Sequence, residues 1–589
     1  MRQRRVASAL AIPLVLAFVA ASCGSDDSSG GDTDTGGEIA TVDDTTAVED
    51  TEAPDDAVTA TTEEKVQTSV VESTETPEYG GTVTVGLEAE TTGLRPWEDI
   101  GSASYVNIAH TIFDRLMARN VDGEYEPYLA ERLESNADFT EWTMTLRPGV
   151  SFSNGSALTA QSIADMFPFQ QEGSSASGAV VSSNLIAVEA VDDLTVKYTL
   201  SAPTTTFPSF LEGAGLGTVF DPVAAADEAA WADNPIGTGP FVLEKRDINN
   251  ETIVVKNPNY WRTDADGLQL PYLDSVSFRP IPDEGTRLNA LVSDSDPVNA
   301  MMTLRAATIG DARGKSGITL NEASGNEVQA HFYNTLRPPF DDLRVRQALN
   351  KMTAQDNVIE ALGGIGEPAT HWQAPGSPYW SQAAADAYLG FDFEAGRALL
   401  QEYIDDPARS DGKSPGAKID VDLQCPPDPT LIAAMQVIQQ VWTQSELVNV
   451  NLTQFDQQTH IDMALNDDTG VHCWRMSGQG DPFGTVGNYL APPETATLNV
   501  SNYFDQQLVD WVAEGSATAD LATRQDLYSN IMTKMNELAL WSYYAHTATL
   551  IATTPDVKGL VNWTLPSGSL GTGVEDAITR WSDVWISQG

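Results

Sequence analysis

The feature that most constrains how this chain can fold is an abrupt change of composition near residue 78. Residues 24–77 contain sixteen Asp or Glu, a single lysine (Lys65) and no aromatic residue, and Ser, Thr and Gly fill most of the remainder. Such a segment cannot bury enough apolar surface to offset the entropy lost on ordering. It is therefore predicted to be a disordered acidic tether, extended by its own charge repulsion. A folded core is expected only over residues 78–589.

The first 23 residues have the pattern of an export signal. Three arginines precede an apolar run over residues 6–21, which is shorter than the roughly 18–20 residues that a membrane-spanning helix needs. This pattern is typical of a secretory signal. Ala20, Ala21 and Ser22 stand before Cys23 in an arrangement similar to a bacterial lipobox, in which the cysteine is lipidated, although Ala20 replaces the usual leucine. The alternative is ordinary secretion with cleavage near Cys23.

Charge and cysteine content narrow the class of protein. The formal net charge of the chain is −52, and −40 of it falls on residues 78–589, so nucleic acid is not an expected partner. Those residues are too many for one simple core, and two or three lobes are expected. Cys425 and Cys473 remain after Cys23; in an exported chain they form either a disulfide or two buried free thiols.

Strand and helix patterns alternate along the folded part. Thr159 is a plausible N-cap for a helix over residues 156–167, and residues 105–118 have apolar side chains at helical spacing. From about residue 341 the predicted helices become longer. Predicted strands cover 80–87, 418–425, 448–455 and 470–477, and predicted helices cover 342–353, 393–403, 431–444 and 521–538. The alternation predicts an α/β lobe with a largely parallel sheet, and the lack of a fixed-period repeat argues against a solenoid or propeller.

Five segments occur in a fixed order along the folded part of the chain. They are 125–163, 234–247 ("NPIGTGPFVLEKRD"), 254–262 ("VVKNPNYWR"), 276–291 and 334–359. Together they resemble the large substrate-binding proteins of bacterial peptide-type ABC transporters (solute-binding family 5), a family that captures oligopeptides, dipeptides, nickel complexes and some sugars. The resemblance extends over nearly all of residues 78–589. Most residues of these segments have a structural interpretation, such as a helix start at Asp341 or Asp342.

The resemblance implies a two-lobed periplasmic-binding-protein type II fold of the α/β class, with an extra subdomain in lobe I and a ligand cleft between the lobes. Lobe I is expected over residues 78–328, lobe II over 329–544, and a return to lobe I over 545–589. Two crossing strands, near 329–335 and 543–552, would form a hinge that permits closure around a ligand.

The implied function is the extracytoplasmic solute-binding component of an ABC importer, which captures a peptide or another small polar solute. Its expected partners are that ligand, the permease subunits, and the outer face of the cell membrane through a lipid on Cys23; the protein is expected to be a monomer. Alternatives on the same fold are binding of a nickel-type metal chelate or an oligosaccharide, or a sensor without transport.

An enzyme is not expected, and neither is a resident cofactor or metal. The sequence contains no His-Glu-x-x-His and no Gly-x-Ser-x-Gly motif. "SDGK" (410–413) lies in a polar loop without the motifs that would accompany a catalytic serine. Six histidines in 589 residues form no local cluster of metal ligands.

The segment "VHCWRMSGQGDPFG" (471–484) is expected to line the cleft. In the peptide-binding relatives, an aspartate shortly after the matching tryptophan pairs with the α-amino group of the peptide. Ser477 or Gly478 stands there in this chain, and Asp481 is interpreted as a helix cap. Arg475 suits an anionic or hydroxyl partner on a ligand, or else pairs with a neighbouring acid. Trp474 either stacks on a ligand or packs in the core.

Further ligand-binding candidates lie in three other segments. The loop 370–380 supplies an ionisable, a stacking and an amide group. Two aromatic residues follow the first strand, and two more lie at the return crossing. These candidates are His371, Trp372 and Gln373, then Trp97 and Tyr105, then Trp541 and Tyr544. They predict a mostly apolar pocket with a few polar anchors.

Overall fold

The computed structural model describes residues 75–588 except 100–101, 294, 456, 466–469, 478–480, 493–497, 562 and 575–576, and it leaves the side chains of 324–326, 457–458 and 477 undescribed. The predicted signal with Cys23, and the predicted tether up to residue 74, lie outside the described residues. Every helix and strand belongs to one compact unit, Lys65–Gly589. Among the described residues, none of the helices has the length and apolar character needed to cross a membrane.

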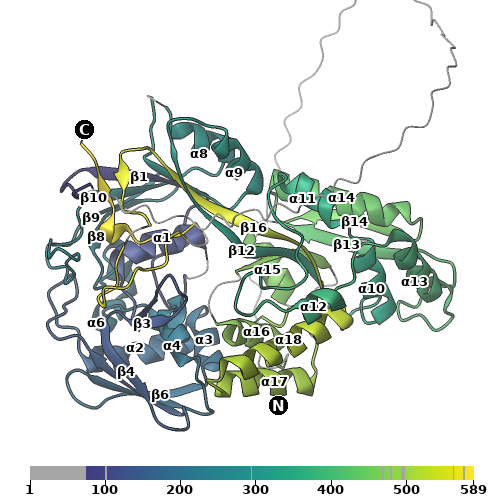
Figure 1. The fold of residues 1–589 in the computed structure, drawn as a ribbon, viewed down its shortest axis with the longest axis horizontal. Coiled ribbons are helices and arrows are strands. Elements are labelled where there is room, and N and C mark those ends of the chain that lie inside the picture. The colour runs from purple at the N-terminus through teal and green to yellow at the C-terminus, as the bar shows by residue number, and fades with distance from the viewer. Residues whose placement is uncertain are drawn as a thin grey trace, which may run out of the picture. The chain divides into compact units, whose positions relative to one another are not determined.

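A ten-stranded mixed sheet runs through both halves of this unit (Figure 1). Its order is β14-β13-β15-β12-β16-β11-β1-β10-β9-β8. The strands are β1 (Thr82–Leu87), β8 (Phe241–Asp247), β9 (Glu251–Lys256), β10 (Ser275–Pro280), β11 (Ala300–Thr303), β12 (Thr319–Tyr333), β13 (Ile419–Cys425), β14 (Val448–Gln454), β15 (Val471–Ser477) and β16 (Trp541–Thr553).

The strands predicted over 418–425, 448–455 and 470–477 pair in parallel, as expected for an α/β lobe, but the ten-stranded sheet as a whole is mixed. β13 pairs in parallel with β14 and β15, and β1 does so with β10 and β11, whereas the other five neighbouring pairs are antiparallel. The reason is that β12 and β16 cross between the lobes in opposite directions, and short connections join β8, β9 and β10.

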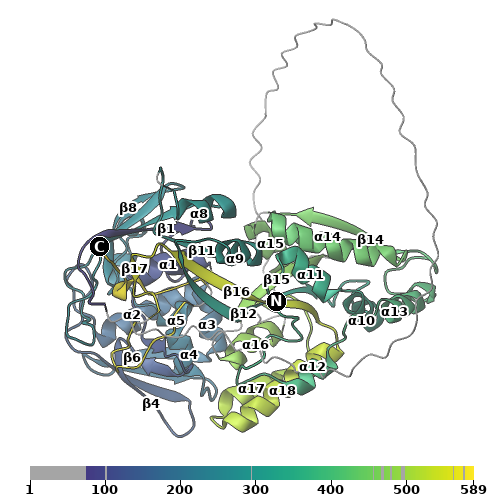
Figure 2. The ribbon, with the colours of Figure 1, turned by 45° about the horizontal axis from the view of Figure 1, so that its top comes forward.

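The two long strands β12 and β16 form the connection between the lobes. At one end, residues 319–323 of β12 pair with 553–549 of β16; at the other, residues 327–333 lie between β16 and β15. The register shifts between Ala323 and Glu327, where three residues of β12 stand opposite one residue of β16, and again between Gln329 and Ala330. Such bulges bend a strand locally, so the ribbon is expected to bend most readily at these positions. Figures 1 and 2 show the ribbon running from the β1 side to the β13 side. The lobe limits at 328/329 and 544/545 remain a proposal.

Lobe I holds a large core with a second, four-stranded antiparallel sheet in the order β4-β5-β7-β6. The strands of this sheet are β4 (Ala130–Ser135), β5 (Glu141–Leu146), β6 (Leu185–Ala190) and β7 (Thr195–Leu200). Two small two-stranded sheets are formed by β2 (Met117–Arg119) with β3 (Tyr125–Pro127), and by β17 (Val557–Lys558) with β18 (Trp585–Ile586). Its helices are α1 (Ala103–Ile112), α2 (Ala160–Glu172), α3 (Ala176–Ser182), α4 (Phe207–Glu212), α5 (Ala214–Gly217), α6 (Pro222–Ala225), α7 (Glu228–Asp233), α8 (Glu284–Ala290), α9 (Ala306–Arg313) and the 3-10 helix η1 (Trp581–Asp583).

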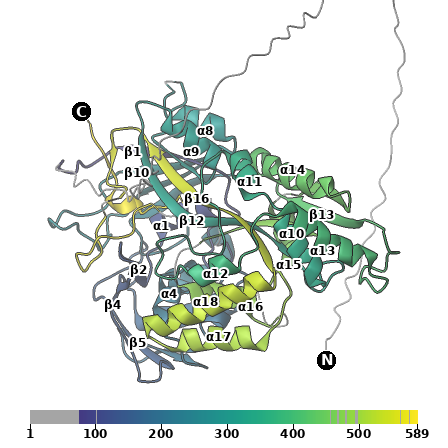
Figure 3. The same cartoon turned by 45° about the vertical axis from the view of Figure 1, so that its right-hand side comes forward.

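Lobe II packs helices against both faces of its strands, so it has two cores. One core includes Val345, Leu349 and Trp442 with strands β13 and β15, and the other includes Phe483 and Tyr528 with β12 and β16. The helices are α10 (Leu343–Lys351), α11 (Gln355–Leu362), α12 (Gln382–Ala387), α13 (Phe393–Asp405), α14 (Pro429–Gln444), α15 (Gln457–Leu465), α16 (Pro482–Leu490), α17 (Gln506–Ala517) and α18 (Leu521–Glu537). Figure 3 shows α16, α17 and α18 together on one side of the β12/β16 ribbon.

Local signals place several element starts correctly. Thr159 caps α2, where its side chain accepts from the backbone N–H of Ser162, and Asp342 caps α10. Asp481 caps α16 by accepting from the N–H of Phe483 at 3.0 Å. The helix predicted over 105–118 is shorter than expected, since α1 ends at Ile112 and the chain then turns into β2.

The close contact between α16 and α17 predicts that Gly515 cannot be replaced by a larger residue without loss of stability. A Cβ at Gly515 would lie 1.9 Å from the Phe483 ring. Gly515→Ala is therefore expected to lower the free energy of unfolding by about 1–3 kcal/mol, although alanine favours helix. Urea denaturation measures the change. Gly390→Ala is the control, because a Cβ at Gly390 has nothing within 4 Å. Equal stability of the two variants would contradict this packing.

Candidate functional site

Arg475 lies where lobe II, the crossing ribbon and lobe I meet. Its Nη2 is 3.9 Å from Oε1 of Glu88, which follows β1, and its Nε is 3.6 Å from Oε1 of Glu327 on β12. The Glu327 side chain is 6% exposed, and those of Glu88 and Arg475 are 16% and 28% exposed. The structure thus favours the alternative in which Arg475 pairs with neighbouring acids. The group of Arg475, Glu88 and Glu327 is called the charged triad below.

The strand register explains how the triad forms. Glu327 stands directly opposite Ser477, and Gln329 stands opposite Arg475, in the antiparallel pairing of β12 with β15. Side chains two residues apart on a strand share a face, so Glu327, Gln329 and Arg475 project from the same face of the sheet. The carboxylate of Glu327 therefore belongs to the residue paired with Ser477, the position at which the peptide-binding relatives are expected to have an aspartate. The Ser477 side chain and Gly478 lie outside the described residues.

Three predicted tryptophans meet in one aromatic cluster of lobe II. Trp474 donates from Nε1 to the hydroxyl of Tyr489 at 3.2 Å, and its ring lies 5.6 Å from that of Phe332. The Tyr489 ring is 5.0 Å from Trp372 and 5.5 Å from Trp541. Trp372 and Trp541 are 3% and 2% exposed, whereas Trp474 is half-buried. Of the three, Trp474 has the most surface to offer a ligand.

The other predicted aromatic residues lie apart from this cluster. Trp97 is 5% exposed in the lobe I core, with its ring 4.8 Å from Phe220, and Tyr105 is 3% exposed in α1. Tyr544 is fully buried and donates from its hydroxyl to the carbonyl of Ala330 at 2.6 Å. The structure gives these side chains a packing role, and their contact with a ligand remains a prediction.

His371 and Gln373 lie inside the loop that the sequence singled out. His371 is fully buried against Trp380, with ring centroids 4.5 Å apart, and its Nδ1 accepts from the backbone N–H of Gln373 at 3.2 Å. The amide oxygen of Gln373 accepts from the hydroxyl of Ser377 at 2.5 Å. Burial lowers the pKa of His371 from 6.5 to about 4, so the imidazole is neutral at neutral pH.

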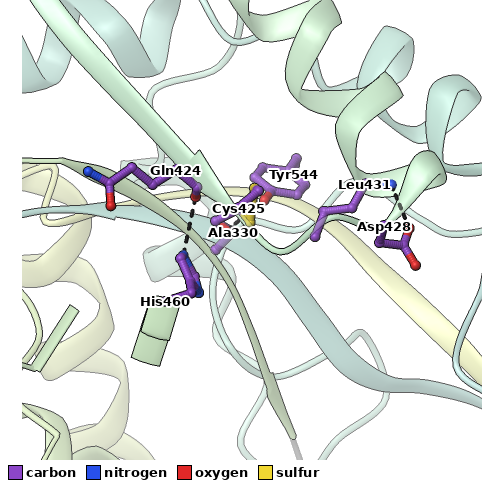
Figure 4. The surroundings of a disulfide bond; sticks show 8 residues. Ala330, Gln424, Cys425, Asp428, Leu431, His460 and Tyr544 are labelled. Atoms are coloured by element: carbon purple, nitrogen blue, oxygen red, sulfur yellow. Dashed lines mark hydrogen bonds between the residues drawn. A yellow bond between two sulfur atoms is a disulfide. The ribbon is translucent and has the colours of Figure 1, made fainter. Parts of the chain in front are cut away.

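Cys425 and Cys473 are joined by a disulfide, with their Cα atoms 5.4 Å apart. They stand at neighbouring positions of β13 and β15, which pair in parallel through Leu423 and Gln424. Figure 4 shows the disulfide beside Ala330 and Tyr544, with the backbone carbonyl of Gln424 hydrogen-bonded to the His460 ring on one side. The bond cross-links the strand that carries Trp474 and Arg475 to the strand before α14.

The lobes also touch far from the triad. The backbone N–H and the hydroxyl of Thr205, in lobe I, donate to the carbonyl of Ser516 at the end of α17, at 2.7 and 2.9 Å. The same hydroxyl lies 3.0 Å from the carbonyl of Thr518. The hydroxyl of Ser182 on α3 donates to the side chain of Asn488 on α16. The structure therefore has its lobes in contact on both sides of the cleft.

Metal binding was one alternative for this cleft. Within the part of the chain that the structure describes, no group of three or more His, Cys, Asp and Glu side chains could hold a metal ion. His460 and His472 lie with ring centroids 5.1 Å apart, and His460 interacts with the carbonyl of Gln424 at 3.2 Å. These contacts belong to the packing between β13, β15 and α15.

A two-lobed fold with a crossing ribbon can be compared with known proteins. The family described as bacterial extracellular solute-binding proteins, family 5 Middle, matches residues 124–495, more than half of the chain. The chain belongs to this family. Family 5 proteins are binding proteins that take small-molecule or peptide ligands and work with ABC permeases.

Two curated proteins and one solved structure are similar to this chain. The nickel-binding periplasmic protein of Escherichia coli K12 is 23% identical over 464 residues, which cover 76% of this chain and 86% of that protein. The dipeptide-binding protein of the same strain is 25% identical over 509 residues, which cover 80% and 91%. The solved structure of the PBP AgaA from A. tumefaciens R10, in complex with agropinic acid, has a TM-score of 0.75 at 23% identity and covers 86% and 99%. The fold is the type II periplasmic-binding fold of this solute-binding family.

Sequence reasoning missed Glu88, Glu327 and Tyr489. Glu88 follows the first predicted strand, and that position alone was a usable signal. Glu327 becomes a neighbour of Arg475 only through the pairing of β12 with β15, strands about 150 residues apart in the sequence. Tyr489 is one of several aromatic residues in its helix region, and nothing local distinguishes it.

Buried histidines predict how stability depends on pH. Burial, together with the nearby His371, lowers the pKa of His546 from 6.5 to about 3. The unfolded chain takes up protons as the pH falls through 6.5, whereas the folded chain does not, so the free energy of unfolding is expected to fall between pH 6.5 and pH 4. Each such histidine contributes up to about 1.4 kcal/mol per pH unit. Urea titrations at several pH values measure the slope; His546→Gln is expected to flatten it, and an unchanged slope would contradict the assignment.

Proposed function

We propose that this protein captures a small polar solute, such as a peptide, in the cleft between its lobes and delivers it to an ABC permease. The observation that carries the proposal is the position of the charged triad. Glu88, Glu327 and Arg475 come from lobe I, the crossing ribbon and lobe II, so charged groups of a captured solute can exchange with these side chains while the lobes close.

The ligand is proposed to contact the charged triad. Arg475 supplies a planar donor for a carboxylate or hydroxyl group of the solute, and the acids opposite supply acceptors for an ammonium group. A peptide or a peptide-like zwitterion carries both kinds of charged group. Trp474 neighbours Arg475 on β15 and therefore projects from the opposite face of the strand, so its stacking on a ligand is a separate proposal.

The same proposal includes the setting in which capture takes place. Cys23 is proposed to carry a lipid that holds the chain at the outer face of the cell membrane, with the acidic segment 24–77 as a tether. The protein is proposed to act as a monomer. The dipeptide-binding and nickel-binding relatives make peptides and metal chelates the first two solute classes to test, with oligosaccharides as the third.

Solute capture predicts a rise in melting temperature with one class of solute. The purified protein is mixed with defined di- and tripeptides, with oligosaccharides and with nickel chelates, and unfolding is followed by fluorescence. A solute at about one hundred times its Kd is expected to stabilise the folded state by about 2.7 kcal/mol. Mass spectrometry of small molecules released by denaturation is an independent check. No shift with any class and no released molecule would sink the proposal.

The charged triad predicts a specific loss of affinity. Arg475→Gln is expected to weaken binding of the solute found in that screen by about 10- to 100-fold, because a hydrogen bond to a charged group contributes about 1.5–3 kcal/mol. Isothermal titration calorimetry measures the Kd. Arg279→Gln is the matched control, because Arg279 pairs with exposed Asp296 within lobe I. If both variants bind like the unaltered protein, Arg475 does not contact the solute.

A further inference from the structure

Two ion pairs of opposite polarity cross between the lobes. Arg305 of lobe I places Nε 2.9 Å from Oδ2 of Asp428 in lobe II, and Arg475 of lobe II lies 3.9 Å from Glu88 of lobe I. Each lobe therefore contributes one cation and one anion. A relative slip that brought the two cations together would be opposed by like-charge repulsion, so the pairs favour one alignment of the lobes.

The Arg305–Asp428 pair lies where the lobes approach each other beside the crossing ribbon. The two side chains line a cavity of about 20 Å³ together with Gln329 of β12 and Thr547 of β16. A cavity of this size holds roughly one water molecule, so a solute group has no room there while the lobes are closed. The pair therefore acts on the lobes and not on the ligand.

Both residues of the pair stand at the start of a helix. Arg305 immediately precedes α9, and Asp428 immediately precedes α14. The Oδ1 of Asp428 accepts from the backbone N–H of Leu431 at 2.9 Å, a contact drawn in Figure 4. That bond fixes one carboxylate oxygen as a helix cap and leaves the other to face Arg305. The two side chains are 24% and 19% exposed, so salt screens their attraction less than that of a fully exposed pair.

We propose that Arg305 and Asp428 are positioning residues that hold the lobes closed and so set how often the cleft opens. The pair exists only while lobe I and lobe II are in contact beside the ribbon, and opening the cleft breaks it. It therefore adds to the closed state without touching the solute. The role goes beyond solute capture, and it is testable without any solute.

Thr205 provides a distant reporter of opening. Its backbone N–H donates across the cleft to the carbonyl of Ser516 at 2.7 Å, a bond that opening also breaks. The exchange rate of this amide with solvent deuterium therefore measures how often the lobes separate. Thr205 lies between β7 and α4, and its hydrogen bonds described above are to Ser516 and Thr518, not to Arg305 or Asp428.

The test compares amide exchange at Thr205 in the full chain, without added solute, for the unaltered protein, Arg305→Gln, Asp428→Asn and the double variant. Asparagine keeps the α14 cap while it removes the charge. Each single variant is expected to exchange about two- to fivefold faster, as for the loss of one partly buried ion pair. The double variant is expected to exchange no faster than either single variant, because both remove the same pair.

Three further measurements separate closure from local structure. Arg305→Lys keeps the charge and is expected to restore most of the protection at Thr205, and Arg279→Gln is expected to leave it unchanged. Raising the ionic strength is expected to speed exchange in the unaltered protein more than in the double variant. Faster exchange confined to the starts of α9 and α14, with Thr205 unchanged, would overturn the proposal. A solute screen without hits leaves this result standing, so failure of the two proposals can be told apart.

Discussion

The pairing of β12 with β16 is the interaction on which the rest of the structure depends. These strands are hydrogen-bonded to each other along nearly their whole length, and they belong to one sheet that serves both lobes. Every side chain of β16 lies at a buried position, so the ribbon also carries core packing for both halves. The register shifts of this ribbon, between Ala323 and Glu327 and between Gln329 and Ala330, are the places where a bend between the lobes is expected.

Charge is unevenly distributed in this protein, and the site reflects that. Asp and Glu number 84 against 32 Lys and Arg, and each of the two arginines between the lobes lies beside at least one acid. Arg475 faces two carboxylates, and Arg305 faces one that already caps a helix. Each arginine therefore both neutralises and orients the carboxylates beside it. Under the proposed function, a solute that contacts Arg475 would replace the contacts of this arginine with Glu88 and Glu327, which would favour zwitterionic or strongly hydrogen-bonding solutes over purely apolar ones.

Local patterns predict the elements of this fold well and its long-range neighbours poorly. The strands near 419–425, 448–454 and 471–477, and the four helices predicted in lobe II (α10, α13, α14 and α18), lie within a few residues of their predicted limits, because amphipathic spacing and caps act over one or two turns. The partners of Arg475 could not be predicted in this way, since Glu88 and Glu327 reach it through strand pairing and lobe contact. The same holds for Trp97, whose aromatic character fits a ligand site and a core equally well, and only burial in three dimensions distinguishes them.

The disulfide has a consequence for how lobe II meets lobe I. Asp428 lies three residues beyond Cys425, and Arg475 lies two residues beyond Cys473. The acid and the base with which lobe II meets lobe I are thus attached to one covalently closed frame. The sulfur–sulfur bond therefore adds a covalent restraint, beside the pairing and core packing of β13 and β15, on the spacing of the two charges that lobe II presents to lobe I.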